Sequence, residues 1–320
     1  MINLKWLSLH QKKNLRLPKK TAGFTLIELL VAMILASLIL TPLLGFMINI
    51  MQTERREQAK TNTEQELKSA LDFIARDLEQ AVYIYDAEGI AAIRDELPKK
   101  SSSDKRKYFP TLVFWKRQFR EKVIPIKKGA KCDTDKEKEK CDDFYTYSLV
   151  AYYLIKDNSS TWSKAARIGR FQISDGYGET DALKNKTKDA GFQPFNLDGR
   201  GDLKTKMNKW KSGTYTTKTP DIVALVDYID QTKIATKTNP TPTKCSDGMQ
   251  QIPDFYRLTK KTNAVAIGDM NTASFHVCVD SINTVAEVYL RGNALARIEN
   301  TPPSYNKERK NYFPQARIRV

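Results

Sequence analysis

The sequence predicts an α+β fold in which a long N-terminal α-helix packs on an antiparallel β-sheet domain. The first observation is an apolar run, Leu29–Met51, that contains 23 residues and no charge. The second is the spacing of apolar residues by three or four between Leu67 and Ala81, which is the period of one helix face. The third is a series of short runs rich in β-branched and aromatic residues after Gly89, which is typical of strands. A helix followed by a series of strands is an α+β arrangement.

The chain divides into three predicted segments. Residues 1–23 form a basic leader, residues 24–88 a long helix, and residues 89–320 a β-rich globular domain. A single helix over Phe24–Tyr85 would be about 93 Å long at about 1.5 Å per residue. Pro42 and Gly45 interrupt its apolar half, where we expect a bend or a melted turn. The predicted strands are Thr111–Trp115, Tyr145–Ile155, Arg167–Ile173, Ile222–Ile229, Ser274–Val279 and Val285–Leu290.

The apolar run Leu29–Met51 is long enough to span a bilayer. Residues 1–23, which precede it, carry basic side chains and no acid, within a chain of net charge +16. Basic residues before a first membrane helix keep that side in the cytoplasm. The sequence therefore predicts a single-pass membrane protein with a cytoplasmic N-terminus and an extracytoplasmic C-terminal domain. The basic residues are Lys5, Lys12, Lys13, Arg16, Lys19 and Lys20.

The junction between the leader and the apolar run differs from an ordinary secretory signal. Such a signal is cut after its apolar region, whereas here Gly23 is followed at once by Phe24-Thr25-Leu26-Ile27-Glu28, so a cut at the junction would keep the apolar segment. A carboxylate such as that of Glu28 costs roughly 2.5 to 3.5 kcal/mol at the centre of a bilayer. Glu28 therefore either acquires a partner or lies near the headgroups, where the cost is small.

The sequence Gly23-Phe24-Thr25-Leu26-Ile27-Glu28 resembles the prepilin peptidase site of type IV pilins and of type II secretion pseudopilins. The resemblance implies cleavage between Gly23 and Phe24, N-methylation of the new Phe24 amine, and assembly of the exposed helix into a filament. It also implies that Glu28 faces the Phe24 ammonium group of a neighbouring subunit. The implied partners are a prepilin peptidase, other pilin or pseudopilin subunits, and an inner-membrane assembly platform. The implied location is the inner membrane, with the C-terminal domain in the periplasm or on a cell-surface filament.

Three later segments are similar to the larger minor pilins and pseudopilins, including those of cyanobacterial hormogonium polysaccharide secretion. They are residues 149–154, 167–171 and 288–297. The resemblance implies a structural pseudopilin in a filament that drives secretion, with polysaccharide as one cargo. A domain of this bulk after the helix favours a low-copy position, at or near the filament tip. Two alternatives stay open: a minor pilin of a pilus for motility, adhesion or DNA uptake, and an anchored binding protein or enzyme outside any filament.

The four cysteines fit an oxidising compartment. The simplest of their three possible connectivities joins Cys132 to Cys141 and Cys245 to Cys278. A metal site is the weaker interpretation, because the chain has no CxxC or HxxxH spacing and two histidines in all, His10 and His276. We expect His276 to have a structural or surface role.

The sequence contains no convincing catalytic pattern, and it predicts neither an enzyme nor a cofactor. Acid-rich turns around Asp175 and Asp198 lack a full calcium-loop pattern and are expected to be solvated turns. Basic clusters could attract an acidic polysaccharide or DNA, although such runs are more often solvated surface. The clusters are Lys99–Lys100, Lys105–Lys107 beside Tyr108, Lys127–Lys131, Lys184–Lys188, and Lys204–Lys211 around Trp210.

Overall fold

The structure is a computed structural model that describes residues 23–98, 107–127, 131–132, 134–176, 188–234, 243–253 and 272–320. Its described residues form a long N-terminal helix followed by antiparallel sheets, which confirms the α+β class. The chain separates into two compact units, Met1–Thr53 and Glu54–Val320, and each is described by itself.

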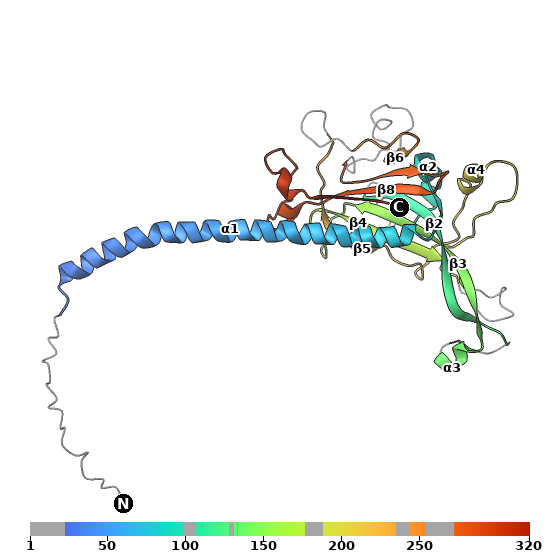
Figure 1. The fold of residues 1–320 in the computed structure, drawn as a ribbon, viewed down its shortest axis with the longest axis horizontal. Helices are drawn as coiled ribbons and strands as arrows, with labels where there is room; N and C mark the ends of the chain where they lie inside the picture. The colour runs from blue at the N-terminus through green and yellow to red at the C-terminus, as the bar shows by residue number, and fades with distance from the viewer. Residues whose placement is uncertain are drawn as a thin grey trace, which may run out of the picture. The chain divides into compact units, whose positions relative to one another are not determined.

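Helix α1 covers Leu26–Leu78 and contributes to both units (Figure 1). All of its residues in the first unit are exposed. In the second unit one face is buried, with residues three or four apart, as the apolar spacing predicts. The helix runs unbroken through Pro42, so the expected melted turn is wrong. The buried residues are Ala59, Thr63, Leu67, Ala70, Leu71, Ile74, Ala75, Asp77 and Leu78.

The predicted end of the long helix at Tyr85 is wrong, because α1 ends at Leu78 and Ala81–Ile84 forms strand β1. Tyr83 pairs with Trp115 of the next strand, so the backbone that leaves the helix finds its partners in a sheet. A short helix, α2 (Ala87–Ile93), follows where we expected strands to begin. The Asp86 carboxylate caps it by accepting a 2.8 Å hydrogen bond from the Gly89 amide.

The first sheet has five antiparallel strands in the order β1-β2-β3-β4-β5. Its strands confirm four predicted runs, and β2 continues far beyond the predicted end at Trp115. The distal part of the β2–β3 hairpin extends away from the rest of the sheet and carries α3 (Asp135–Lys138) near its end (Figure 1). The bounds are β2 Tyr108–Pro125, β3 Cys141–Ile155, β4 Ala166–Ser174 and β5 Val223–Ile229.

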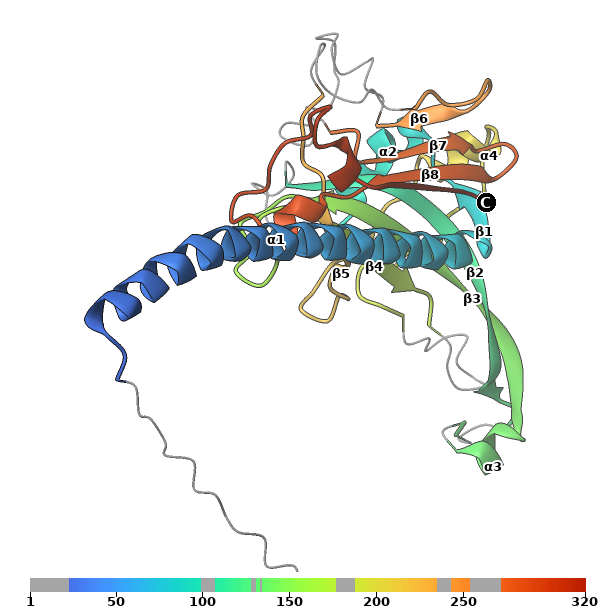
Figure 2. The same ribbon diagram turned by 60° about the vertical axis from the view of Figure 1, so that its left-hand side comes forward.

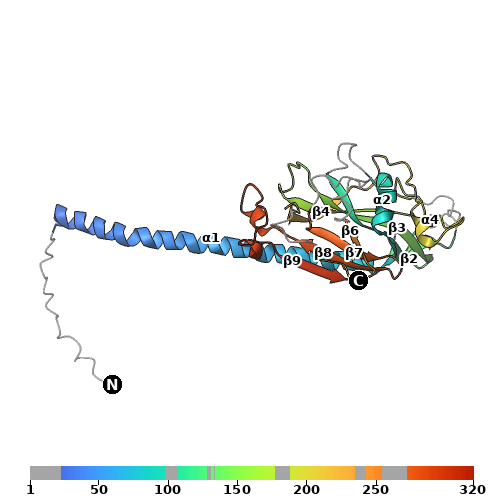
Figure 3. The same cartoon turned by 90° about the horizontal axis from the view of Figure 1, so that it is seen from above.

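The second sheet has four antiparallel strands in the order β6-β7-β8-β9, drawn side by side in Figure 3. Strands β7 (Phe275–Asp280) and β8 (Val285–Arg291) were predicted. Strands β6 (Gln250–Ile252) and β9 (Gln315–Arg319) were not. A bridge between Ile229 and Gly292 connects β5 to the residue that follows β8.

The second half of α1 runs beside both sheets, near β4 and β5 and near β8 and β9 (Figure 2). Gly292 permits one close approach. A Cβ atom at this glycine would lie 2.5 Å from Thr63 Cγ2 and 3.2 Å from Leu67 Cδ1. The sequence between β4 and β5, with α4 (Leu203–Met207), packs Phe192 and Trp210 against the buried Trp115.

Candidate functional site

The N-terminal end of α1 is built as a capping box. Gly23, Phe24 and Thr25 precede the helix, and Glu28 lies in its first turn. The Glu28 carboxylate accepts hydrogen bonds from the Thr25 amide and hydroxyl, both at 3.3 Å, and the Glu28 amide donates to the Thr25 hydroxyl at 3.3 Å. Thr25 and Glu28 therefore satisfy amide groups that a helix start leaves without partners.

Gly23 is not required by packing within the chain. A Cβ atom at this position would meet nothing within 4 Å. A requirement for glycine at position 23 would therefore come from a molecule that acts on this segment.

The first half of α1 presents a continuous apolar surface. Phe24 is 83% exposed and Leu26 86% exposed, and every residue up to Gln58 is exposed. Glu28 is the single charged residue between Phe24 and Thr53. An apolar surface of this extent requires lipid or other apolar helices around it.

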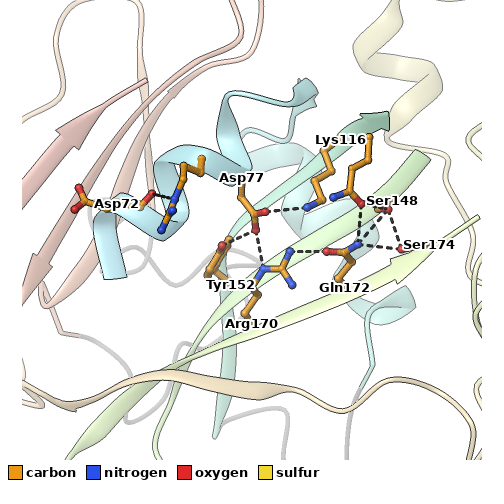
Figure 4. Close-up of polar contacts among 10 residues, drawn as sticks. Asp72, Asp77, Lys116, Ser148, Tyr152, Arg170, Gln172 and Ser174 are labelled. Carbon is orange, nitrogen blue, oxygen red and sulfur yellow. Dashed lines mark hydrogen bonds and ion pairs between the residues drawn. The ribbon is translucent and has the colours of Figure 1, made fainter. Parts of the chain in front are cut away.

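The second half of α1 ends in a buried charge cluster centred on Asp77 (Figure 4). The Asp77 carboxylate accepts hydrogen bonds from Lys116 Nζ at 2.8 Å, Tyr152 hydroxyl at 2.7 Å and Arg170 Nε at 2.7 Å. Burial alone raises the pKa of Asp77, but the hydrogen bonds from Arg170 and Lys116 outweigh it and hold this pKa below its usual value. The three donors belong to β2, β3 and β4, so one carboxylate joins the helix end to three strands.

Sequence reasoning missed Asp77, although the sequence carries a signal for it. Asp77 follows Ile74 by three positions and precedes Leu78, so it lies on the apolar face that the periodicity defines. An acid on a buried helix face needs a cationic partner, which could have prompted a search for one. The partner residues, on strands distant in sequence, could not be identified from that spacing.

A groove of about 970 Å³ lies between α1 and strand β5 within the unit Glu54–Val320. Its helix wall extends from Asn62 to Arg76, and its strand wall from Ala224 to Tyr228. The residues Thr161–Ser163, from the loop between β3 and β4, complete it. Sequence reasoning did not find this groove, because its two long walls are more than a hundred residues apart in the chain.

Both disulfides have the expected connectivity. Cys132 is bonded to Cys141 at the base of α3, and Cys245 is bonded to Cys278 of β7. Cys278 is fully buried, so the second bond attaches the segment before β6 to the core of the four-stranded sheet.

His276 has a structural role, which is one of the two roles that we expected. Its side chain is buried and its ring stacks on Tyr289, with the ring centroids 4.6 Å apart. Burial lowers the pKa of His276 to about 4. In the described part of the chain no group of three or more His, Cys, Asp or Glu residues is placed to hold a metal ion.

Two of the four lysines in the basic cluster Lys204–Lys211 are engaged in ion pairs within the chain. Lys204 forms ion pairs with Asp86 and Glu88, and Lys211 forms one with Glu96. Trp210 is buried and donates from Nε1 to the Gln193 carbonyl at 2.8 Å, so its ring is not available to a ligand. Tyr108 is likewise buried.

Several predicted features lie outside the described residues. They are leader residues 1–22, including His10, and most of the other basic clusters, residues 99–100, 105–106, 128–130 and 184–187. The acid-rich turn after Phe195 is described. There Asn196 accepts from the Asp198 amide at 2.7 Å, and Asp202 caps α4 by accepting from the Thr205 amide at 2.8 Å.

Comparison with known families identifies the N-terminal segment. Residues 18–44 match the family model of the prokaryotic N-terminal methylation motif. No curated protein and no solved structure matches the chain. The motif spans Gly23, Phe24 and Glu28, and it supports a type IV pilin-like subunit.

Among the described helices, α1 is the one whose length and composition would allow it to cross a membrane, a test that signal sequences and core helices also pass. The methylation motif covers the start of the same helix. This coincidence favours a membrane-spanning helix over a signal sequence or a core helix. Together they indicate a single-pass membrane anchor.

Proposed function

We propose that the chain is a pseudopilin: a structural subunit that prepilin peptidase cuts between Gly23 and Phe24 and methylates at Phe24. Residues 1–23 are then the discarded leader, residues 24–88 contain the assembly helix, and residues 89–320 form the extracytoplasmic domain. The mature subunit enters, at low copy, a filament that drives secretion, with polysaccharide as cargo. It has a structural and not a catalytic function.

One observation carries this proposal: the apolar first half of α1 is exposed throughout and contains a single carboxylate, Glu28. An inert anchor gains nothing from an acid next to its apolar run, because a carboxylate that enters the hydrocarbon of the bilayer carries a cost. A filament core of packed helices gives Glu28 a partner, the methylated Phe24 ammonium of a neighbouring subunit. The methylation motif over the same residues supports that pairing.

The first experiment is the mass of the N-terminal peptide of the protein purified from its native membrane. A peptide that starts at Phe24 and carries one added methyl group is the expected result. An uncut Met1, or a cut after Met51, would return the chain to the class of anchored proteins outside a filament.

A glycine substitution tests the peptidase site directly. Gly23→Leu should leave a precursor that is longer by the leader, because a side chain at that position blocks the peptidase. Gly45→Leu is the matched control, since neither glycine has a neighbour within 4 Å of an added Cβ atom. Normal processing of the Gly23 variant would contradict the assignment.

A deletion strain separates secretion from a pilus function. Loss of exported polysaccharide with surface pili retained is the expected result. Loss of the pili themselves would instead assign the chain to a pilus for motility, adhesion or DNA uptake.

A further inference from the structure

The groove between α1 and β5 contains two aromatic side chains that remain accessible. Phe73 is 38% exposed and Trp162 is 43% exposed, although both are large apolar residues. Each ring has a guanidinium over it, Arg170 at 5.4 Å from the Phe73 centroid and Arg167 at 5.9 Å from the Trp162 centroid. These contacts hold the rings in place before any ligand arrives.

The two guanidinium groups are themselves fixed by carboxylates. Arg167 makes two hydrogen bonds to Asp157, at 2.6 and 2.7 Å, and Arg170 donates to Asp77. Each aromatic ring is therefore restrained by a cation that is itself anchored, which lowers the entropy lost when a ligand stacks on the ring.

The helix wall of the groove supplies neutral polar groups. Asn62, Gln65 and Ser69 are exposed and lie three or four residues apart on one face of α1. No hydrogen bond joins these three side chains to any residue that the structure describes. Two amides and a hydroxyl can donate and accept hydrogen bonds with a ligand that carries many hydroxyl groups.

The carboxylates of the groove are already engaged. Glu66 is bonded to Arg297. Asp227 accepts hydrogen bonds from the Ser163 amide at 2.9 Å, the Ser163 hydroxyl at 2.8 Å and the Tyr228 amide at 2.8 Å. The groups left for a ligand are thus aromatic rings, amides and hydroxyls, together with the guanidinium of Arg76 at one end.

This combination matches the chemistry of a sugar chain. A pyranose ring has an apolar face of C–H groups that can cover an aromatic ring, and a rim of hydroxyls that pair with amides. From these groups we propose that the groove binds a segment of a polysaccharide chain, with Phe73 and Trp162 stacking on sugar rings and Asn62 and Gln65 bonding their hydroxyls.

An extended peptide added to the edge of β5 fits the groove less well. The pairing of β4 with β5 shifts register twice, between Ala166 and Ile168 and between Ile168 and Gly169, so β5 is an irregular template. The end of the strand is occupied, because the Tyr228 carbonyl accepts from the Asn293 amide at 2.7 Å. A sugar chain needs only the side chains of the groove.

The identification of the bound sugar chain as the cargo rests on the proposed function. Binding itself is measured on the purified subunit, without a filament. A subunit that binds sugars and is never processed would overturn the proposed function alone. A subunit that is processed and assembles but does not bind would overturn the groove proposal alone.

Tryptophan fluorescence of the detergent-solubilised full chain provides the test. Trp115 and Trp210 are buried, so Trp162 is the exposed tryptophan among the described residues. The probes are cellohexaose, mannohexaose and hexagalacturonate, which sample neutral and acidic sugar chains. We expect a saturable change in fluorescence with at least one of them, and loss of that change in Trp162→Phe.

Affinity measured by calorimetry separates stacking from a general effect of mutation. Trp162→Ala and Gln65→Ala should each weaken binding, the first by about tenfold or more. Phe119→Ala is the matched control, because Phe119 is an exposed aromatic on the distal β2–β3 hairpin and lines no part of the groove. Three outcomes would overturn the proposal: no saturable binding with any of the probes, equal affinity in all three variants, or binding of an unstructured peptide in preference to the sugars.

Discussion

The carboxylate of Asp77 accepts a 2.7 Å hydrogen bond from Nε of Arg170, and this contact joins the end of α1 to strand β4. The same carboxylate accepts from Lys116, whose side chain is 3% exposed. Two buried or half-buried cations therefore depend on one acid. Removing one partner of such a group leaves charge in the interior without compensation, which costs more than the pair itself contributes.

Asp77→Ala should lower the free energy of unfolding by about 3 to 5 kcal/mol, because Lys116 and Arg170 would lose their shared counter-ion. Urea unfolding of the solubilised protein measures the change. Asp72→Ala is the matched control on the same helix. Its carboxylate is exposed, and Arg76 Nε donates to its backbone carbonyl, which the substitution keeps. We expect that control within about 0.5 kcal/mol of the parent, and equal stability of the two variants would contradict the charge-cluster interpretation.

His276 should make stability fall as the solution becomes acidic. Burial depresses its pKa from 6.5 to about 4, so between these values the unfolded chain binds a proton that the folded chain does not. The contribution is fully present above about pH 6.5 and is lost as the pH falls toward 4. Its loss between about pH 7.5 and about pH 5 amounts to about 2 kcal/mol.

The measurement is urea unfolding at several pH values for the parent and for His276→Gln. The variant should lose most of the slope between about pH 7 and about pH 5, whatever its stability at neutral pH. Once the leader with His10 is removed, His276 is the remaining histidine, which makes the assignment of the slope direct. An unchanged slope would show that the pKa of His276 is the same in the folded and the unfolded chain.

Gly292→Ala should be destabilising by about 1 to 3 kcal/mol, because its methyl group would lie 2.5 Å from Thr63 Cγ2. Thr63→Ser removes that carbon but retains the hydroxyl that accepts from Arg297 Nε at 2.9 Å. The double variant should therefore recover much of the loss. If the effects of the two single changes on the free energy of unfolding simply add in the double variant, the helix and the loop after β8 are not in contact at this point.

The sequence was sufficient for features that depend on local pattern. Apolar spacing of three or four located the buried face of α1, and β-branched runs located β3, β4, β7 and β8. The sequence was insufficient where contacts between distant parts of the chain determine the local structure. Residues 81–84 fit the helix period as well as a strand, and pairing with Trp115 and its neighbours selects the strand. The Asp77 cluster and the groove require knowledge of which distant strands meet α1.

The two disulfides should differ in what they contribute. Their cysteines are 9 and 33 residues apart, and closing the longer loop restrains the unfolded chain more. Replacing Cys245 and Cys278 by Ser should cost about 1 kcal/mol more than replacing Cys132 and Cys141, since the loop-entropy estimates are about 3.7 and 2.6 kcal/mol. Urea unfolding of the two double variants gives the comparison, and a larger loss from the Cys132–Cys141 pair would contradict it.

Glu28→Gln separates two roles of the Glu28 side chain. In the capping box the carboxylate accepts from the amide and the hydroxyl of Thr25, and a glutamine can accept in the same geometry. The variant therefore keeps the helix start but loses the charge that would pair with the Phe24 ammonium of a neighbouring subunit. We expect normal cleavage and methylation, shown by the N-terminal mass, with little incorporation into purified filaments. Glu54→Gln, which removes a carboxylate just beyond the apolar run, should incorporate normally. If Glu28→Gln also incorporated normally, capping of the helix would be the full role of Glu28.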